Sequence, residues 1–448
     1  MSMVPVMPST MNLFEASEGE EQSPGPAAQD EPTVEGDRPR FQRAVRDQEE
    51  VEIRSLDKTL PLDHTARMVW SAAEKLDLSA FYKSIRAVEG HVGRPPIDPR
   101  ILFALWVYAT LDGVGSARQL ADLCEESTPY RWLCGGVGVN HHALSDFRTG
   151  HAAKIRQLLI QHVASLRATG LVELRRVTQD GIKVRASAGA GSFRREGKLR
   201  ALLHEAEDQV ALLERQAKDP AGVRTREQAA KERAAQERKD NLEAALEAVG
   251  RVQAARTKTK VAYKDRRDPS EARASTTDPD ARAMRMSDGG TRPAYNAQFV
   301  TDTKAGIVVD VGLAESSADQ PELPPRLDAI KEAYGEVPAE AIVDAGYFTR
   351  ATIEHASAVG TKLYMPVRER RRAQKKRESE AMEAYRARMA TPEGQAILKQ
   401  RGRWAEWVHA LARNRGLTRL VVRGRCKVLA VLAWYAIAHN IAVAASQS

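Results

Sequence analysis

Three acids stand out because of where they lie. Asp180 interrupts VTQDGIKVRA, a segment of alternating polar and apolar residues, and Asp344 ends the short apolar run AIVD. Glu406 lies in the helical segment RWAEWVHALARNRG. Because a strand that buries an unpaired charge loses several kcal/mol of stability, acids in strand segments usually have a functional partner. The three acids therefore predict a metal site, and the basic chain around them indicates a polyanion as substrate.

The bulk composition limits the class of protein. The chain has 448 residues with 42% hydrophobic content, enough for two or three domains with their own cores. The net charge of +8 favours nucleic acid as a partner, although charge alone leaves open a merely basic protein. Cys124, Cys134 and Cys426 fit no zinc motif and indicate reduced thiols in a cytoplasmic protein. The N-terminus lacks the pattern of a signal peptide.

The first third of the chain is predicted to be a tail followed by helices. Residues 1–45 are rich in Pro, Glu, Ser, Gly and Gln and are expected to be disordered. Over residues 46–170, apolar residues repeat at three- and four-residue spacing, with Ser145 as a candidate helix cap. We expect an all-helical N-terminal domain that binds DNA or dimerises, with a plain packing role equally open.

Residues 171–448 are predicted to form an α/β domain. A strand at 174–187 is followed by a charged helical hairpin with coiled-coil character, inserted at about 194–270. We expect this hairpin to be largely solvated, with contact to DNA or another subunit as a less favoured role. A β-hairpin turned at 303–306, a helix, the strand ending at Asp344, a helix and a last strand then predict a mixed sheet flanked by helices.

The C-terminal part is basic and then apolar. RERRRAQKKR, residues 368–377, is interpreted as a linker or a phosphate-contacting segment, and a charged helix is expected at 378–400. The uncharged stretch Val428–Ala445 is long enough to span a membrane, but it is Ala-rich and contains His439 and Asn440. A buried C-terminal helix is therefore the preferred prediction, and a membrane-anchored protein the alternative.

The three acids suit two-metal phosphodiester chemistry. Asp180 in the first strand would bridge two ions, Asp344 on a neighbouring parallel strand would hold one, and Glu406 on a later helix the other. Mg²⁺ is the expected ion and Mn²⁺ a possible one, since both take carboxylate oxygens. Basic residues near the acids are expected to contact DNA phosphates: Arg401, Arg413, Arg415, Arg419, Arg423, Lys183 and Arg185.

Several neighbours have two interpretations. The three-residue spacing places His409 on roughly the same helical face as Glu406. His409 would then be a metal ligand or proton carrier. The simpler interpretation is a DNA contact or a buried, hydrogen-bonded ring. Trp404 and Trp407 would stack on a flipped base or anchor the helix as core aromatics. The polar residues Asp278, Asp280 and Asn296 either support the acids or, for the two aspartates, serve as turn and cap residues.

The chain resembles DDE transposases of bacterial insertion sequences, which have a helical N-terminal domain and an RNase H-like core. The resemblance rests on TQDGIKVRASAGAGSFRR, STTDPDARAMRMSDGGTRPAYNAQFVTDT, AIVDAGYFT and AEWVHALARNRGLTRLVVRGRCKVLAVLAWYAIAHN. Arg413 stands seven residues after Glu406, as a basic residue does in the family, whereas the family's Tyr and Arg before the Glu are not matched; Arg401 and Arg403 lie near the Arg position.

This resemblance implies Asp180, Asp344 and Glu406 as the catalytic triad of a metal-dependent enzyme. Such an enzyme cuts the inverted-repeat ends of its own element and transfers them to target DNA, acting as a homodimer or higher oligomer in the cytoplasm, on the nucleoid and not at a membrane. Two alternatives remain: a DNA-binding protein derived from a transposase, and a metal-dependent nuclease without strand transfer.

Overall fold

A helical region precedes a mixed α/β region in the computed structural model, which describes residues 53–83, 85, 95–217, 225–263, 268–367 and 379–447. The chain divides into two units, residues 1–53 and 54–448, and only the second is considered below. The predicted disordered tail, residues 1–45, and the basic segment 368–377 lie outside the described residues.

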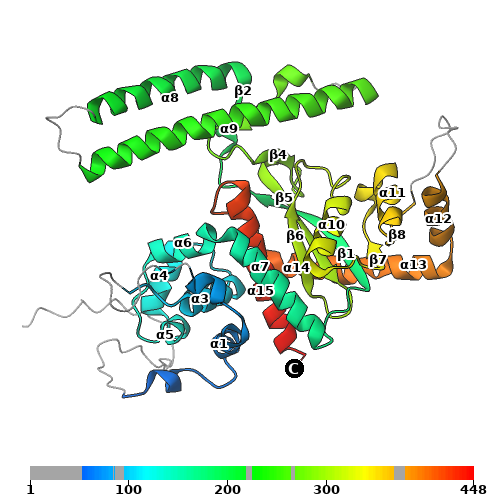
Figure 1. Ribbon diagram of the computed structural model, residues 1–448, viewed down its shortest axis with the longest axis horizontal. Coiled ribbons are helices and arrows are strands. Elements are labelled where there is room, and N and C mark those ends of the chain that lie inside the picture. The colour runs from blue at the N-terminus through cyan, green and yellow to red at the C-terminus, as the bar shows by residue number, and fades with distance from the viewer. Residues whose placement is uncertain are drawn as a thin grey trace, which may run out of the picture. The chain divides into compact units, whose positions relative to one another are not determined.

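Short helices form the region before the sheet (Figure 1). They are η1 (Leu56–Thr59), α1 (Thr65–Lys75), α2 (Ser79–Tyr82), α3 (Pro99–Leu111), α4 (Ala117–Glu126), α5 (Thr128–Cys134), α6 (His141–Gly150) and α7 (Ala152–Ala168). Helix α3 begins at Pro99, after Asp98 has capped the Arg100 N–H, and it is buried on nearly all sides. Ser145 lies inside α6, and Asn140 supplies the cap that was predicted for Ser145.

The sheet has six strands in a mixed arrangement. It contains β1 (Arg176–Arg185), β4 (Arg282–Arg285), β5 (Thr291–Asp302), β6 (Val308–Leu313), β7 (Glu340–Ile342) and β8 (Lys362–Tyr364). The strand order is β4-β5-β1-β7-β8, with β6 also paired to β5. Strand β1 is antiparallel to β5 and parallel to β7. A helical region followed by a mixed sheet confirms the predicted fold class.

The helices around the sheet are α10 (Leu323–Tyr334), α11 (Arg350–Ala358), α12 (Glu380–Met389), α13 (Pro392–Lys399), α14 (Arg401–Asn414) and α15 (Arg425–Ala445). The single helix expected at 378–400 is instead two helices, and that prediction was wrong. Pro392 begins α13 and Thr391 caps it through the Gly394 N–H, because proline cannot continue a helix hydrogen-bond ladder.

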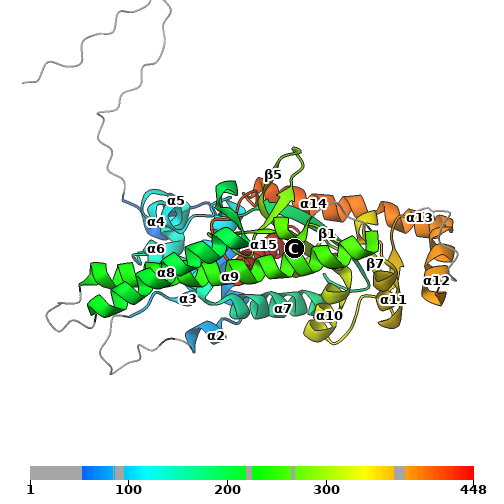
Figure 2. The same cartoon turned by 90° about the horizontal axis from the view of Figure 1, so that it is seen from above.

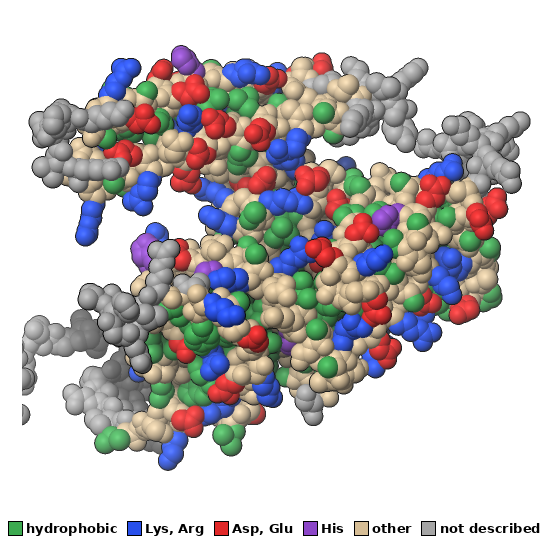
Figure 3. Space-filling view, viewed as in Figure 1, with side chains coloured by type: hydrophobic (Ala, Val, Ile, Leu, Met, Phe, Trp, Pro, Cys, Tyr) green, Lys and Arg blue, Asp and Glu red, His purple; other side chains and the backbone are tan. Residues whose placement is uncertain are grey.

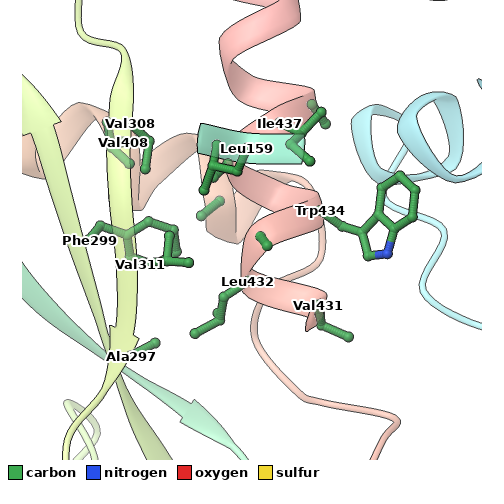
Figure 4. Packing of buried hydrophobic residues seen from close by; sticks show 14 of the residues in the cluster. Leu159, Ala297, Phe299, Val308, Val311, Val408, Val431, Leu432, Trp434 and Ile437 are labelled. Atoms are coloured by element: carbon green, nitrogen blue, oxygen red, sulfur yellow. The ribbon is translucent and has the colours of Figure 1, made fainter. Parts of the chain in front are cut away.

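Helix α15 joins the helical region to the sheet. It packs on α3, α6 and α7 on one side and on β6 on the other. Figure 4 shows Leu432 of α15 directed toward Phe299 and Val311 of the sheet, and Trp434 directed toward the helical region. The helix is long and apolar enough to cross a membrane, but 72% of its apolar window is buried inside the protein. This burial supports the predicted core helix.

A long helical hairpin is inserted after β1. Helices α8 (Glu196–Ala217) and α9 (Arg226–Tyr263) lie side by side in both views (Figures 1 and 2), and the short strands β2 (Phe193–Arg195) and β3 (Arg273–Ser275) pair at its base. Leu199, Ala206, Leu242 and Val249 belong to a core of its own, separate from the main core. The hairpin therefore holds itself together without the sheet.

Candidate active site

The topology of the sheet brings Asp180 and Asp344 to one place. Strand β7 pairs only with Arg176–Thr178 of β1 and ends at Ile342, whereas β1 continues to Arg185. Asp180 therefore lies just beyond the end of this pairing, and Asp344 follows the end of β7. Because parallel strands end at the same edge of a sheet, the two carboxylates become neighbours although they are far apart in sequence.

Each carboxylate is oriented by a backbone N–H. The Gly181 N–H donates to Asp180 Oδ1 at 2.8 Å, and the Gly346 N–H donates to Asp344 Oδ1 at 2.6 Å, where Asp344 caps η4 (Ala345–Tyr347). Burial raises the pKa of Asp180 to about 6, and the negative charges of Asp344 and Asp319 add to this effect, while the Gly181 N–H and Arg401 oppose it. Neighbouring negative charges of this kind favour a bound cation.

Helix α14 covers Asp180 with Arg401 and His409. Arg401 Nη1 lies 3.3 Å and His409 Nδ1 lies 3.9 Å from Asp180 Oδ2. The His409 ring is 5% exposed and packs edge-on to Phe299, with ring centroids 6.0 Å apart. Burial lowers the pKa of His409 to about 4, so the imidazole is neutral at pH 7. His409 is thus a buried ring beside Asp180.

Glu406 lies on the exposed side of α14. Its side chain runs along the helix, since a Cβ added to Gly402 would lie 3.5 Å from Glu406 Oε1. His409 is buried whereas Glu406 is exposed, which favours the buried-ring interpretation of His409 over that of a ligand beside Glu406. A helical step of three residues turns the helix about 60° short of a full circle, enough to separate a buried from an exposed position.

The two aspartates fit a magnesium ion without Glu406. Within the described residues, no group of three or more His, Cys, Asp or Glu side chains is close enough to hold a metal. Mg²⁺ does not need such a group, because it is commonly held by one or two carboxylates together with waters and substrate phosphates. Asp180 and Asp344 are two carboxylates of this kind, so their chemistry fits the ion.

A buried polar network lies against the same strand, and of its members the sequence analysis singled out only Asn296. The carboxylate of Asp319 accepts hydrogen bonds from Asn296 Nδ2 at 2.7 Å and Gln298 Nε2 at 2.8 Å. Gln298 Oε1 accepts from the hydroxyl of Tyr347 and from Gln179 Nε2. The network therefore links β1, which carries Asp180, to the turn that carries Asp344. Its sequence signal was the presence of amide side chains in otherwise buried strands.

At position 181, glycine is the only residue type that leaves room for this network. A Cβ at this position would lie 2.5 Å from Asp319 Oδ1, 2.5 Å from Gln298 Nε2 and 2.7 Å from Asn296 Oδ1. These atoms are held by hydrogen bonds and by their burial, so they cannot move aside at low cost.

We therefore expect Gly181→Ala to lower the free energy of unfolding by about 1–3 kcal/mol through overpacking. Urea denaturation followed by circular dichroism measures this change. Gly250→Ala in α9 is the matched control, because nothing lies within 4 Å of its added Cβ, and it should stabilise the helix slightly. Equal unfolding midpoints for Gly181→Ala and the unsubstituted protein would contradict the expectation.

The predicted DNA-contacting residues are only partly gathered. Backbone hydrogen bonds join Arg185 to Thr418 and Leu420, so the segment with exposed Arg413 and Arg419 runs beside the end of β1. Three other residues predicted to contact DNA already have partners within the protein. Lys183 Nζ donates to the Arg285 carbonyl, Arg423 Nε donates to the Ser187 carbonyl, and Arg401 contacts Asp180. Arg415 is half-buried, and its carbonyl accepts from Tyr435.

The remaining polar candidates have structural contacts. Asp278 Oδ1 accepts from the Tyr295 hydroxyl and the Gly424 N–H, and Asp280 Oδ2 accepts from the Arg425 N–H, so both aspartates hold the start of α15. The rings of Trp404 and Trp407 lie against Gly306 in the β5–β6 turn, where an added Cβ would meet both. These contacts favour the interpretation of the two aspartates as cap residues and of the two tryptophans as core aromatics that anchor α14.

Two family models match the chain. Residues 54–150 match a transposase domain (DUF772), and residues 267–428 match a transposase DDE domain. The second match includes Asp344 and Glu406 and begins after Asp180. No curated protein and no solved structure matches the chain. Together with a helical region that precedes a mixed, RNase H-like sheet, these matches show that the chain belongs to the DDE-type transposases of insertion elements.

Proposed function

We propose that this transposase cuts the inverted-repeat ends of its own element and transfers them to target DNA, with Asp180, Asp344 and Glu406 as the catalytic acids. The observation that carries the proposal is the meeting of Asp180 and Asp344 at the end of the β1–β7 pairing, where the charge of one raises the pKa of the other. Paired carboxylates at one strand edge suit the binding of Mg²⁺ or Mn²⁺.

The chain's own residues would prepare the phosphodiester for attack. Asp180 and Asp344 would hold a divalent ion, as enzymes of this family normally do. When bound, that ion stabilises charge on the attacking and leaving oxygens of an in-line displacement. Gly181 and Gly346 keep the two carboxylates oriented, and buried His409 and Phe299 exclude water from one side of Asp180.

Glu406 would join the site when DNA binds. It lies on α14, the helix whose Arg401 and His409 contact Asp180, and this shared helix supports the proposal. We further propose that the protein works on double-stranded DNA as a homodimer or higher oligomer, because two element ends must be joined. The domains proposed are a helical one at 46–170 and a catalytic one at 171–448, in a cytoplasmic protein.

The test is incubation of the purified full-length protein with labelled element-end duplexes, a target plasmid and Mg²⁺. We expect both 3′-nicked ends and products joined to the plasmid. EDTA should remove both products, and added Mn²⁺ should restore them. Cut ends without joined products would indicate a nuclease, and bound but uncut DNA would indicate a DNA-binding protein that is no longer catalytic.

A further inference from the structure

A groove lies between the inserted hairpin and the edge of the sheet, away from the acids. Its volume is about 860 Å³, and its lining includes Arg251 and Arg256 of α9, Arg282 of β4 and Arg292 of β5. We call this the hairpin groove. Figure 3 shows Lys and Arg side chains on both sides of the junction between the hairpin and the sheet.

The lining of the hairpin groove is positively charged. Arg273 of β3 adds a fifth arginine, and the lining contains two acids, Glu271 and Glu315. Both acids have arginine partners, since Glu271 pairs with Arg195 and Glu315 pairs with Arg425. Outside the lining, Arg292 pairs with Asp288 at 2.6 Å and Arg251 with Glu247 at 3.7 Å. The lining itself still contains more arginines than acids.

Two arginines of the groove repel each other. Burial is the main cause that lowers the pKa of Arg282, and the positive charge of Arg251 lowers it further, while Asp280 and Glu315 offset part of the effect. The Arg282 guanidinium donates to the Pro279 and Ala281 carbonyls, which carry no full charge. An anion between the two walls would relieve the repulsion.

The hairpin groove lies apart from the acids, but the chain that lines it continues to the active site. Its wall at residues 315–318 runs directly into Asp319, which packs against Gly181, the residue after Asp180. Across the sheet, Arg282 of β4 pairs with Ala294 of β5, and Ala294 pairs with Arg185 of β1. Arg185 is five residues along β1 from Asp180. At about 3.4 Å per strand residue, this offset is about 17 Å.

We infer that the hairpin groove holds backbone phosphates of the element-end DNA, about five nucleotides from the phosphate that is cut beside Asp180. The distance follows from a rise of about 3.4 Å per nucleotide along each DNA strand. Arginines that face phosphates fix the position of a duplex without reading its sequence. This inference rests on the proposed function and assigns the inserted hairpin a role in holding DNA.

The test compares two double variants of the full-length protein. Arg251→Gln with Arg273→Gln removes two exposed charges from the groove. Arg200→Gln with Arg238→Gln removes two exposed charges from the hairpin outside it. Binding of a labelled end duplex is measured by fluorescence anisotropy at several salt concentrations. In the groove variant, the slope of log K against log salt should become shallower by about 0.9 for each phosphate that is no longer neutralised, and the control should keep its slope.

Hydroxyl-radical footprinting locates the bound phosphates. Protection about five nucleotides from the cut should disappear in the groove variant and persist in the control. Equal slopes and footprints for the two variants would overturn the inference, as would a groove variant that keeps its DNA binding but loses self-association in sedimentation. If the unsubstituted protein bound no end duplex, the proposed function itself would fail; if it bound and cut the duplex and the groove variant did the same, only the inference would fail.

Discussion

Asp180→Asn is expected to lower the rates of end cleavage and strand transfer by about 10³-fold while leaving the fold and DNA binding intact. Asparagine keeps the size of the side chain but removes the charge that a divalent ion needs, and loss of one such electrostatic group costs about 10²–10³ in rate. Single-turnover cleavage of a labelled end duplex measures the change. Asp63→Asn, at an exposed position just before α1, is the matched control.

The same substitution should raise stability in metal-free buffer. The folded-state pKa of Asp180 is about 6, above an unfolded value of about 3.9. The folded protein therefore favours the protonated carboxyl, and the contribution of this group to stability is lost as the pH rises through about 6. At pH 7 a neutral Asn avoids this loss of stability. We therefore expect the Asp180→Asn variant to be less active but more resistant to urea.

Glu406→Gln provides the companion measurement. If Glu406 joins the site on DNA binding, this variant should lose activity to a similar degree but show no gain in stability, because the side chain is exposed in the DNA-free protein. Activity within a few-fold of the unsubstituted protein would remove Glu406 from the proposed triad and leave the two aspartates in place. Retained activity in Asp180→Asn would instead reject the metal site.

Trp434→Ala should destabilise the protein by about 3–5 kcal/mol, the usual loss for a buried aromatic side chain. Trp434 is 1% exposed. Its ring centroid lies 5.4 Å from that of Phe103 and 6.1 Å from that of Phe147, and its Nε1 donates to the Arg148 carbonyl. The residue thus joins α15 of the catalytic region to the N-terminal helices.

Urea unfolding followed by far-ultraviolet circular dichroism measures this loss. Trp407→Ala is the control of matched chemistry, since Trp407 is 37% exposed and should cost less. Because the cavity would open between the two regions, the Trp434→Ala transition should also broaden or separate into two steps. A loss below about 1 kcal/mol would show that the helical region does not depend on α15.

Local patterns predicted most of the elements. The three- and four-residue spacing of apolar side chains indicated α3 and α4, alternation indicated β1, and the turn at 303–306 indicated the β5–β6 hairpin. The break between α12 and α13 also had a local signal, Thr391 followed by Pro392, which the charge pattern of the segment concealed. Such signals are visible because helix and strand periodicities act over a few neighbouring residues.

The sequence by itself determined that Asp180 belongs to a strand, which segment forms the inserted hairpin and that residues 428–445 of α15 carry no formal charge. Only the tertiary structure decided that Asp319 approaches Gly181, that His409 rather than Glu406 faces Asp180, and that the arginines of the hairpin and of β4 line one groove. These relations join residues far apart in the chain. They depend on strand register and on the rotation of packed helices, which no short window of sequence specifies.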